Sequence, residues 1–178
     1  MDEWTKVKGR FKEITFVEPV EQLLRLASEQ LQEDRGSIAP PMTKNIFLLA
    51  KNTRFVTDDF SEDVARKLYP LDTFSAYAIT TAIQRYGQNE RSLFTFLSSK
   101  GENSISEFED CEFLTYNLEN VYDYILYNFY SYLKDANADS MSWSSIQVAI
   151  ERVEGQDWES KEQMLSAVKI VKALGLLN

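Results

Sequence analysis

The sequence predicts an all-α fold, a single helical domain of about seven to nine helices. Apolar residues recur at helical spacing along most of its 178 residues, as they do on the buried faces of packed helices. Prolines, glycines and capping residues divide this pattern into segments of helical length. The one segment that alternates like a strand, Phe11–Val17, has no predicted partner and is expected to be extended chain. We expect a helical body over residues 1–135 and a C-terminal helical pair over 136–178 packed on it.

The first predicted helix covers residues 19–34, where the apolar residues form one stripe. Pro19 stands at its start, where a first-turn proline is tolerated. Residues 37–43 are predicted to form a loop, because the dipeptide Pro40-Pro41 interrupts helical geometry. A short apolar segment, residues 45–50, follows this loop.

Three helices are predicted in the middle of the chain. Ser61 is an expected N-cap, followed by acidic residues that favour a helix start. This helix ends before Pro70, whose ring disfavours helical geometry at the preceding residue. An amphipathic helix then covers about 71–86. Asn89 is expected to cap a further helix that ends near Ser98.

The C-terminal part begins with a capping-box pattern at Ser104, which predicts a short helix. Asn117 or Thr115 is then expected to start a long aromatic helix that ends near Asp135. The tyrosines of this helix fit either a platform that stacks on bases or a helix buried on several sides. The scarcity of basic residues nearby favours burial.

Two more helices are predicted at the end of the chain, over about 142–154 and 157–174. Asp157 is expected to cap the second of them. Gly175 stands at the position typical of a glycine that ends a helix.

Composition excludes several classes of enzyme. The chain has no histidine and one cysteine, Cys111, which excludes Ser-His-Asp and Cys-His catalysis, His-ligated zinc and disulfide frameworks. Its six glycines are isolated in the sequence, so the chain lacks the two common glycine-rich phosphate loops. We therefore expect no catalytic residue, no metal site and no cofactor in this chain.

Charge is distributed unevenly. Residues 1–100 hold 14 basic and 14 acidic side chains, whereas residues 101–178 hold 5 and 14, and the formal net charge is −9. An acidic C-terminal part argues against a surface for nucleic acid or anionic membranes. It is either a solvated face or a docking surface for a basic partner. Because the chain shows no apolar leader and no apolar run of membrane-spanning length, we expect it to be cytoplasmic and without a membrane partner.

One polar cluster, Gln88, Asn89, Glu90 and Arg91, stands at a predicted helix start. A helix N-terminus exposes N–H groups that favour anions, and an arginine there can bind a phosphate or a carboxylate with two hydrogen bonds. A structural interpretation also fits, in which Asn89 caps the helix, Glu90 complements its dipole and Arg91 forms an ion pair.

The order of motifs along the chain resembles the middle of large bacterial AAA-like P-loop ATPases, some of which belong to phage-defence and DNA-modification gene clusters. The stretch QNERSLFTFL at residues 88–97 is the most specific part of this resemblance. The other matching segments extend over most of the chain and include Trp4, Gly9-Arg10-Phe11, Glu18-Pro19, Tyr69-Pro70-Leu71, Tyr122-Asp123-Tyr124 and the last eight residues, 171–178.

The resemblance implies that this chain is a non-catalytic helical lid or regulatory segment, with residues 1–135 as the lid-like region. ATP and Mg would then bind elsewhere in the parent protein, and the partners would be the rest of that ATPase and its other subunits. Arg91, and after it Arg10, would be the residues that approach a phosphate. The family commonly has a histidine near Leu71, where this chain has Asp72. The alternative function is a free-standing acidic helical module that binds another protein.

Overall fold

The computed structural model describes residues 18–35, 38–86, 91–98, 101–108, 115–129, 133 and 140–177. These residues form eight α-helices and one short 3-10 helix, and no β-sheet occurs among them, which confirms the predicted all-α fold. The helices are α2 (Val20–Arg35), α3 (Pro41–Asn52), α4 (Glu62–Lys67), α5 (Thr73–Tyr86), α6 (Arg91–Ser98), η1 (Ile105–Glu107), α7 (Leu118–Asn128), α9 (Ser140–Glu154) and α10 (Lys161–Leu177).

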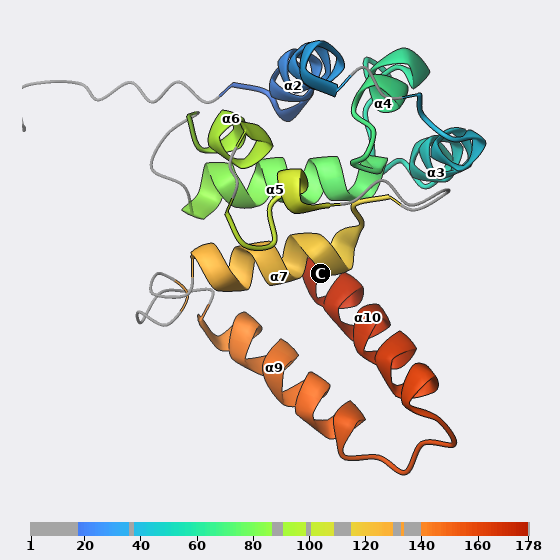
Figure 1. Ribbon diagram of the computed structural model, residues 1–178, viewed down its shortest axis with the longest axis vertical. Helices are drawn as coiled ribbons and strands as arrows, with labels where there is room; N and C mark the ends of the chain where they lie inside the picture. The colour runs from blue at the N-terminus through green and yellow to red at the C-terminus, as the bar shows by residue number, and fades with distance from the viewer. Residues whose placement is uncertain are drawn as a thin grey trace, which may run out of the picture.

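Helix α5 lies at the centre of the molecule (Figure 1). It packs against α2, α3 and α6 on one side and against α7 on the other. Helices α9 and α10 form an antiparallel hairpin that contacts α7 and projects away from the other helices. The described helices therefore form a body and a projecting hairpin, while the predicted boundary at residue 136 lies outside the described residues.

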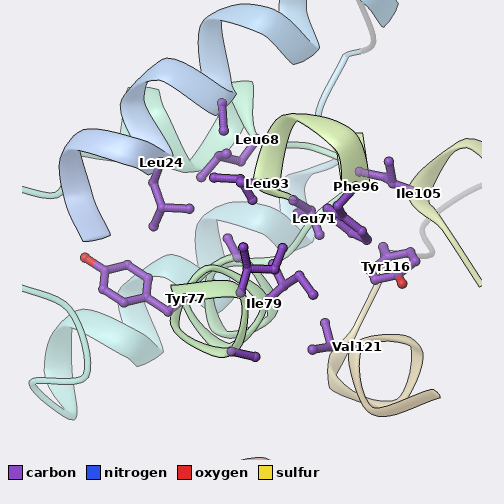
Figure 2. Close-up of a cluster of buried hydrophobic side chains, with 14 of the residues drawn as sticks. Leu24, Leu68, Leu71, Tyr77, Ile79, Leu93, Phe96, Ile105, Tyr116 and Val121 are labelled. Atoms are coloured by element: carbon purple, nitrogen blue, oxygen red, sulfur yellow. The ribbon is translucent and has the colours of Figure 1, made fainter. Parts of the chain in front are cut away.

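The hydrophobic core lies between α5 and its neighbours (Figure 2). Leu24 of α2, Ile79 of α5, Leu93 and Phe96 of α6 and Val121 of α7 are each buried almost completely. These residues come from the apolar stripes of their helices, so burial of the stripes holds the helices together.

A short backbone pairing joins the segments that precede α5 and α7. The backbone N–H of Tyr116 donates to the carbonyl of Pro70 at 2.8 Å, and Leu71 and Tyr116 form an isolated parallel bridge. Both side chains are buried in the core. The pairing therefore fixes the starts of two helices that are distant in the sequence.

Two predicted N-caps are confirmed. At the start of α4, Ser61 Oγ accepts a hydrogen bond from the N–H of Val64 at 3.3 Å. At the start of α7, the side chain of Asn117 accepts from the N–H of Glu119 at 2.8 Å, while Asn120 Oδ1 accepts from the N–H of Asn117 at 3.0 Å. Such caps depend on neighbouring residues alone, which is why the sequence predicts them.

The structure shortens the predicted loop over residues 37–43, because residues 38–40 are irregular but a helix follows directly. Helix α3 begins at Pro41, so the apolar segment 45–50 belongs to a helix of 12 residues. Pro41 occupies the first turn, where its missing N–H would have no partner within the helix. Pro40 has the extended conformation of an N-cap. The prediction was wrong for residues 41–43 because adjacent prolines disrupt the interior of a helix but not its start.

Two other capping predictions differ from the structure. The short helix predicted after Ser104 is present as η1, with Ser104 at its N-cap position, but Ser104 provides no capping hydrogen bond, and its Oγ lies 2.9 Å from Ser106 Oγ instead. Helix α10 is capped by Ser160, whose Oγ accepts from the N–H of Gln163 at 3.2 Å, and not by Asp157. In both places several polar residues stand in a row, and the sequence does not indicate which of them is aimed at the helix.

Helix α7 is shorter than predicted, since it ends at Asn128 rather than near residue 135. The burial predicted for it is confirmed for Tyr122 and Tyr124, whereas Tyr127 is exposed. Tyr122 packs against Trp143 of the hairpin, and Tyr124 packs against Phe96 of α6.

Candidate functional site

The structure does not describe the side chains that are predicted to bind a phosphate. Gln88, Asn89, Glu90 and Arg10 lie outside the described residues. Arg91 is the first residue of α6, and its side chain also lies outside the described part. The anion site predicted there therefore stays a prediction.

Asp72, the residue before α5, is buried with 6% of its surface exposed. Its Oδ1 accepts from the N–H of Ser75 at 2.8 Å, and Thr115 Oγ1 lies 3.5 Å from Oδ2. Burial raises the pKa of Asp72, against the opposing effect of these hydrogen bonds. The carboxylate thus caps α5, which gives it a structural role without a ligand.

The most organised cluster of polar and aromatic side chains lies where the hairpin joins the body. Lys172 Nζ of α10 lies 2.7 Å and 2.8 Å from the two carboxylate oxygens of Asp123 on α7. It also lies 5.6 Å from the ring centroid of Tyr122, within range of a cation–π contact. Nearby, Lys169 forms an ion pair with Glu119 at 3.1 Å. Two ion pairs therefore connect α10 to α7.

Aromatic contacts continue from this ion pair to α9 and α5. The rings of Tyr122 and Trp143 lie 5.5 Å apart. Trp143 Nε1 donates to the hydroxyl oxygen of Tyr86 on α5 at 3.1 Å. The hydroxyl of Tyr122 is buried and has no hydrogen-bond partner in the described structure. Burial raises the pKa of Tyr122 to about 12. All four helices of the junction thus meet through these side chains.

Gly175 brings the two hairpin helices close together, which corrects its predicted role as the end of a helix. It lies inside α10, which continues to Leu177. A Cβ atom at Gly175 would lie 2.7 Å from two side-chain carbons of Ile146 on α9. The residue is therefore required for the approach of the helices rather than for a turn.

A cavity of about 580 Å³ lies at this junction, and we call it the junction cavity. Helix α5 contributes Ala78, Ala82 and Arg85, which repeat at helical spacing along one face. The hairpin closes the other side with Trp143 and Gly175 among other residues. Its walls are polar and apolar in similar measure, and Arg85 is the one charged side chain among the described lining residues.

A second notable surface lies on the outside of the hairpin. Ala167, Ile170 and Leu174, which we call the α10 strip, follow one another at helical spacing. Ile170 is 60% exposed and Leu174 is 62% exposed. The strip lies on the side of α10 away from Val168, the buried residue of that helix. Ala167 is half-buried, so the exposed part of the strip is formed by Ile170 and Leu174.

The open end of the hairpin is acidic. Five acidic side chains around the turn between α9 and α10 are exposed, namely Glu151, Glu154, Asp157, Glu159 and Glu162. They are not grouped as metal ligands, and no cluster of three or more potential metal ligands occurs among the residues that the structure places. In the same residues, no helix is both long and apolar enough to cross a bilayer.

Comparison of the chain with models of known families, with curated proteins and with solved structures finds no match.

The sequence alone did not predict the junction at which the α9–α10 hairpin meets α7 and α5. A signal was present in the charges, because Glu119 and Asp123 share one face of α7 while Lys169 and Lys172 share one face of α10. Such complementary pairs indicate that two helices pack together. The junction cavity had no comparable signal, since its walls come from distant parts of the chain.

Proposed function

We propose that this chain is a non-catalytic helical lid segment of a large cytoplasmic bacterial P-loop ATPase, and that its α9–α10 hairpin passes the nucleotide state to a neighbouring domain. The observation that carries the proposal is the exposed α10 strip. Contiguous apolar residues on a surface favour contact with another protein or domain. The QNERSLFTFL motif at residues 88–97 supplies the ATPase context.

The attachment of the hairpin suits such a role. Lys172 and Lys169 hold one end of α10 on α7 through ion pairs, while the other end of the hairpin projects away from the body (Figure 1). Helices move as rigid units in many switching proteins. A change in the body would therefore displace the α10 strip, which is the part that we expect to contact the neighbour. ATP and Mg would bind in the nucleotide-binding core of the parent protein.

The experiment is a measurement of ATP hydrolysis by the complete ATPase carrying Ile170→Glu. A charge in the α10 strip would disturb an apolar contact, so we expect a reduced or uncoupled rate. Ser166→Glu is the matched control, because it adds the same charge to an exposed position on the same helix. Equal rates for both variants would contradict the proposal, as would hydrolysis of ATP by this chain alone.

The acidic end of the hairpin favours a second function, a free-standing module that binds a basic protein. Five exposed carboxylates would attract a basic surface, and salt would weaken this attraction. A partner bound at low salt and lost at high salt would support this function. Binding that resists salt and is lost in Ile170→Glu would support the ATPase segment instead, because apolar contacts are not screened by ions.

A further inference from the structure

The α10 strip belongs to a longer face of α10 that has the spacing of a helix-packing surface. We call it the outer face, and it consists of Gln163, Ala167, Ile170, Leu174 and Leu177. These residues follow one another at intervals of four, three, four and three, the spacing at which one helix packs along another. Ile170, Leu174 and Leu177 are 60%, 62% and 45% exposed. At a rise of about 1.5 Å per residue, the outer face is about 20 Å long.

The opposite side of α10 shows how the same repeat is used within this chain. It packs against α9, with Val168 buried and Gly175 in close contact with Ile146. Val168 and Gly175 are seven residues apart, as are Ile170 and Leu177. Helix α10 thus has two sides with one repeat, and a helix fills the inner one. The outer face therefore has the shape and spacing to receive a second helix.

Negative charge lies at one end of the outer face. Gln163 Nε2 donates to Glu159 Oε2 at 3.3 Å, which places Glu159 beside the first residue of the face. The acidic turn, residues 151–162, holds five acidic and two basic side chains, a formal net charge of −3, and all seven are exposed. At the other end, Lys169 and Lys172 are balanced by carboxylates of α7. A helix on this face therefore meets different charge at its two ends.

We propose that the outer face and the acidic turn together bind one amphipathic helix of the neighbouring domain, apolar along one stripe and basic at one end. The stripe lies on Ile170 and Leu174, and the basic end lies over Glu159. Apolar contact supplies most of the affinity, and the charges fix the direction of the helix. This inference rests on the proposed function, which assigns the α10 strip to a neighbouring domain, and it adds the chemistry and direction of the partner.

A second copy of this chain does not provide that partner. Its own α10 would have to supply the basic end, and the two lysines in the second half of that helix, Lys169 and Lys172, are held by Glu119 and Asp123. The formal net charge of −9 on each copy also opposes self-association. The partner is therefore expected to be a different helix with lysines or arginines of its own.

The probes are three synthetic peptides of about 20 residues, long enough to cover the outer face. Each has leucines at the four-three spacing, alanine and glutamine elsewhere, and a block of lysines, glutamines or glutamates at one end. Fluorescence anisotropy measures their binding to the full chain. We expect the lysine peptide to bind about tenfold more tightly than the glutamine peptide at low salt, and the glutamate peptide to bind most weakly. High salt should bring the three affinities together without abolishing binding, because ions screen the charges and not the apolar contact.

Variants of the carboxylates test the basic end of the partner. The double variant Glu159→Gln with Glu162→Gln is expected to weaken binding of the lysine peptide at low salt and to leave the glutamine peptide unchanged. Glu29→Gln with Glu33→Gln is the matched control. Both residues are exposed on α2, which lies at the end of the molecule opposite the hairpin (Figure 1). This control is expected to leave all three affinities unchanged.

Variants of the apolar residues test the stripe. Ile170→Glu is expected to abolish binding of all three peptides. Leu165→Glu is the matched control, because Leu165 is also an exposed apolar residue of α10, at 45%, and lies outside the outer face. Circular dichroism of both variants shows whether they remain folded.

Three results would overturn the inference: equal affinity for the lysine and glutamate peptides at low salt, binding of the lysine peptide that survives Ile170→Glu, and no saturable binding of that peptide. Dimerisation of the chain alone that is lost in Ile170→Glu would also overturn it, and would assign the face to a second copy. Failure of the proposed function is a separate result, since it appears as normal ATP hydrolysis by the complete ATPase carrying Ile170→Glu.

Discussion

Lys172 Nζ on α10 lies 2.7 Å and 2.8 Å from the two carboxylate oxygens of Asp123 on α7. This ion pair joins the hairpin to the body. The side chain of Lys172 is 15% exposed. The neighbouring ion pair between Lys169 and Glu119 is more exposed to solvent, since the Lys169 side chain is 56% exposed. The two pairs have the same charges at the same interface, but the Lys172 pair is better shielded from water and Lys172 also lies over the ring of Tyr122.

Replacement of Lys172 by Met is expected to lower the free energy of unfolding by about 1–3 kcal/mol, as is typical for the loss of a shielded hydrogen bond to a charged group. Lys169→Met is the control and is expected to cost less than about 1 kcal/mol, because exposed ion pairs are weak. Urea denaturation measures both values. Equal losses would show that Lys172 does not anchor the hairpin.

A second prediction concerns the contact of Gly175 with Ile146. Alanine at position 175 gains about 1 kcal/mol of helix propensity, but its Cβ would overlap the side chain of Ile146, and overpacking costs about 1–3 kcal/mol. We therefore expect Gly175→Ala to destabilise the protein.

The background Ile146→Ala provides the control for this prediction, because it removes the overlapping carbons. In that background, Gly175→Ala is expected to stabilise the protein instead. A double-mutant cycle by thermal unfolding measures the coupling. The same effect of Gly175→Ala in both backgrounds would contradict the close approach of α9 and α10.

A third prediction follows from the burial of Asp72, which raises its pKa in the folded state. Between the unfolded pKa, about 3.9, and this raised value, the folded state binds more protons than the unfolded state. The contribution of Asp72 to the free energy of unfolding is therefore lost as the pH rises through that interval.

Asp72→Asn retains an oxygen that accepts from Ser75 and cannot ionise. We expect this variant to be more stable than the natural chain at pH 7, with a difference that shrinks toward pH 4. Chemical denaturation as a function of pH measures the difference. A variant that is less stable at pH 7 would show that the ionised carboxylate is required to cap α5.

Tyr122 leads to a fourth prediction, because its buried hydroxyl has no hydrogen-bond partner in the described structure. Tyr122→Phe removes that hydroxyl, so it is expected to raise the free energy of unfolding by up to about 1 kcal/mol. Its pKa is raised to about 12, and the natural chain therefore loses stability as the pH rises from about 10 to 12. Denaturation across this interval should show a smaller loss for the variant, and an equal loss would contradict the assignment.

The sequence predicts the features that depend on neighbouring residues. The helical class, the stripe of α2 and the caps at Ser61 and Asn117 all follow from local spacing and hydrogen-bonding groups. Features that depend on distant residues are predicted poorly. Gly175 has the local pattern of a helix end, yet α10 continues past it because its packing against Ile146 requires a glycine.

The candidate site shows the same limit. The face of α5 that carries Ala78 and Arg85 has an ordinary amphipathic pattern in the sequence. Only the packing of the hairpin against this face creates the junction cavity. The exposure of Ile170 and Leu174 was equally unpredictable, because an apolar stripe does not indicate whether another helix covers it.

The most direct test of the proposed function is methyl NMR of Ile170 and Leu174 during titration with the nucleotide-binding core of the parent ATPase. We predict saturable shifts of both methyl groups, which depend on whether ATP or ADP is bound, while the methyl groups of buried Ile79 and Leu24 stay unchanged. Binding that leaves the resonances of Ile170 and Leu174 unchanged would contradict the proposal that the α10 strip is the contact surface.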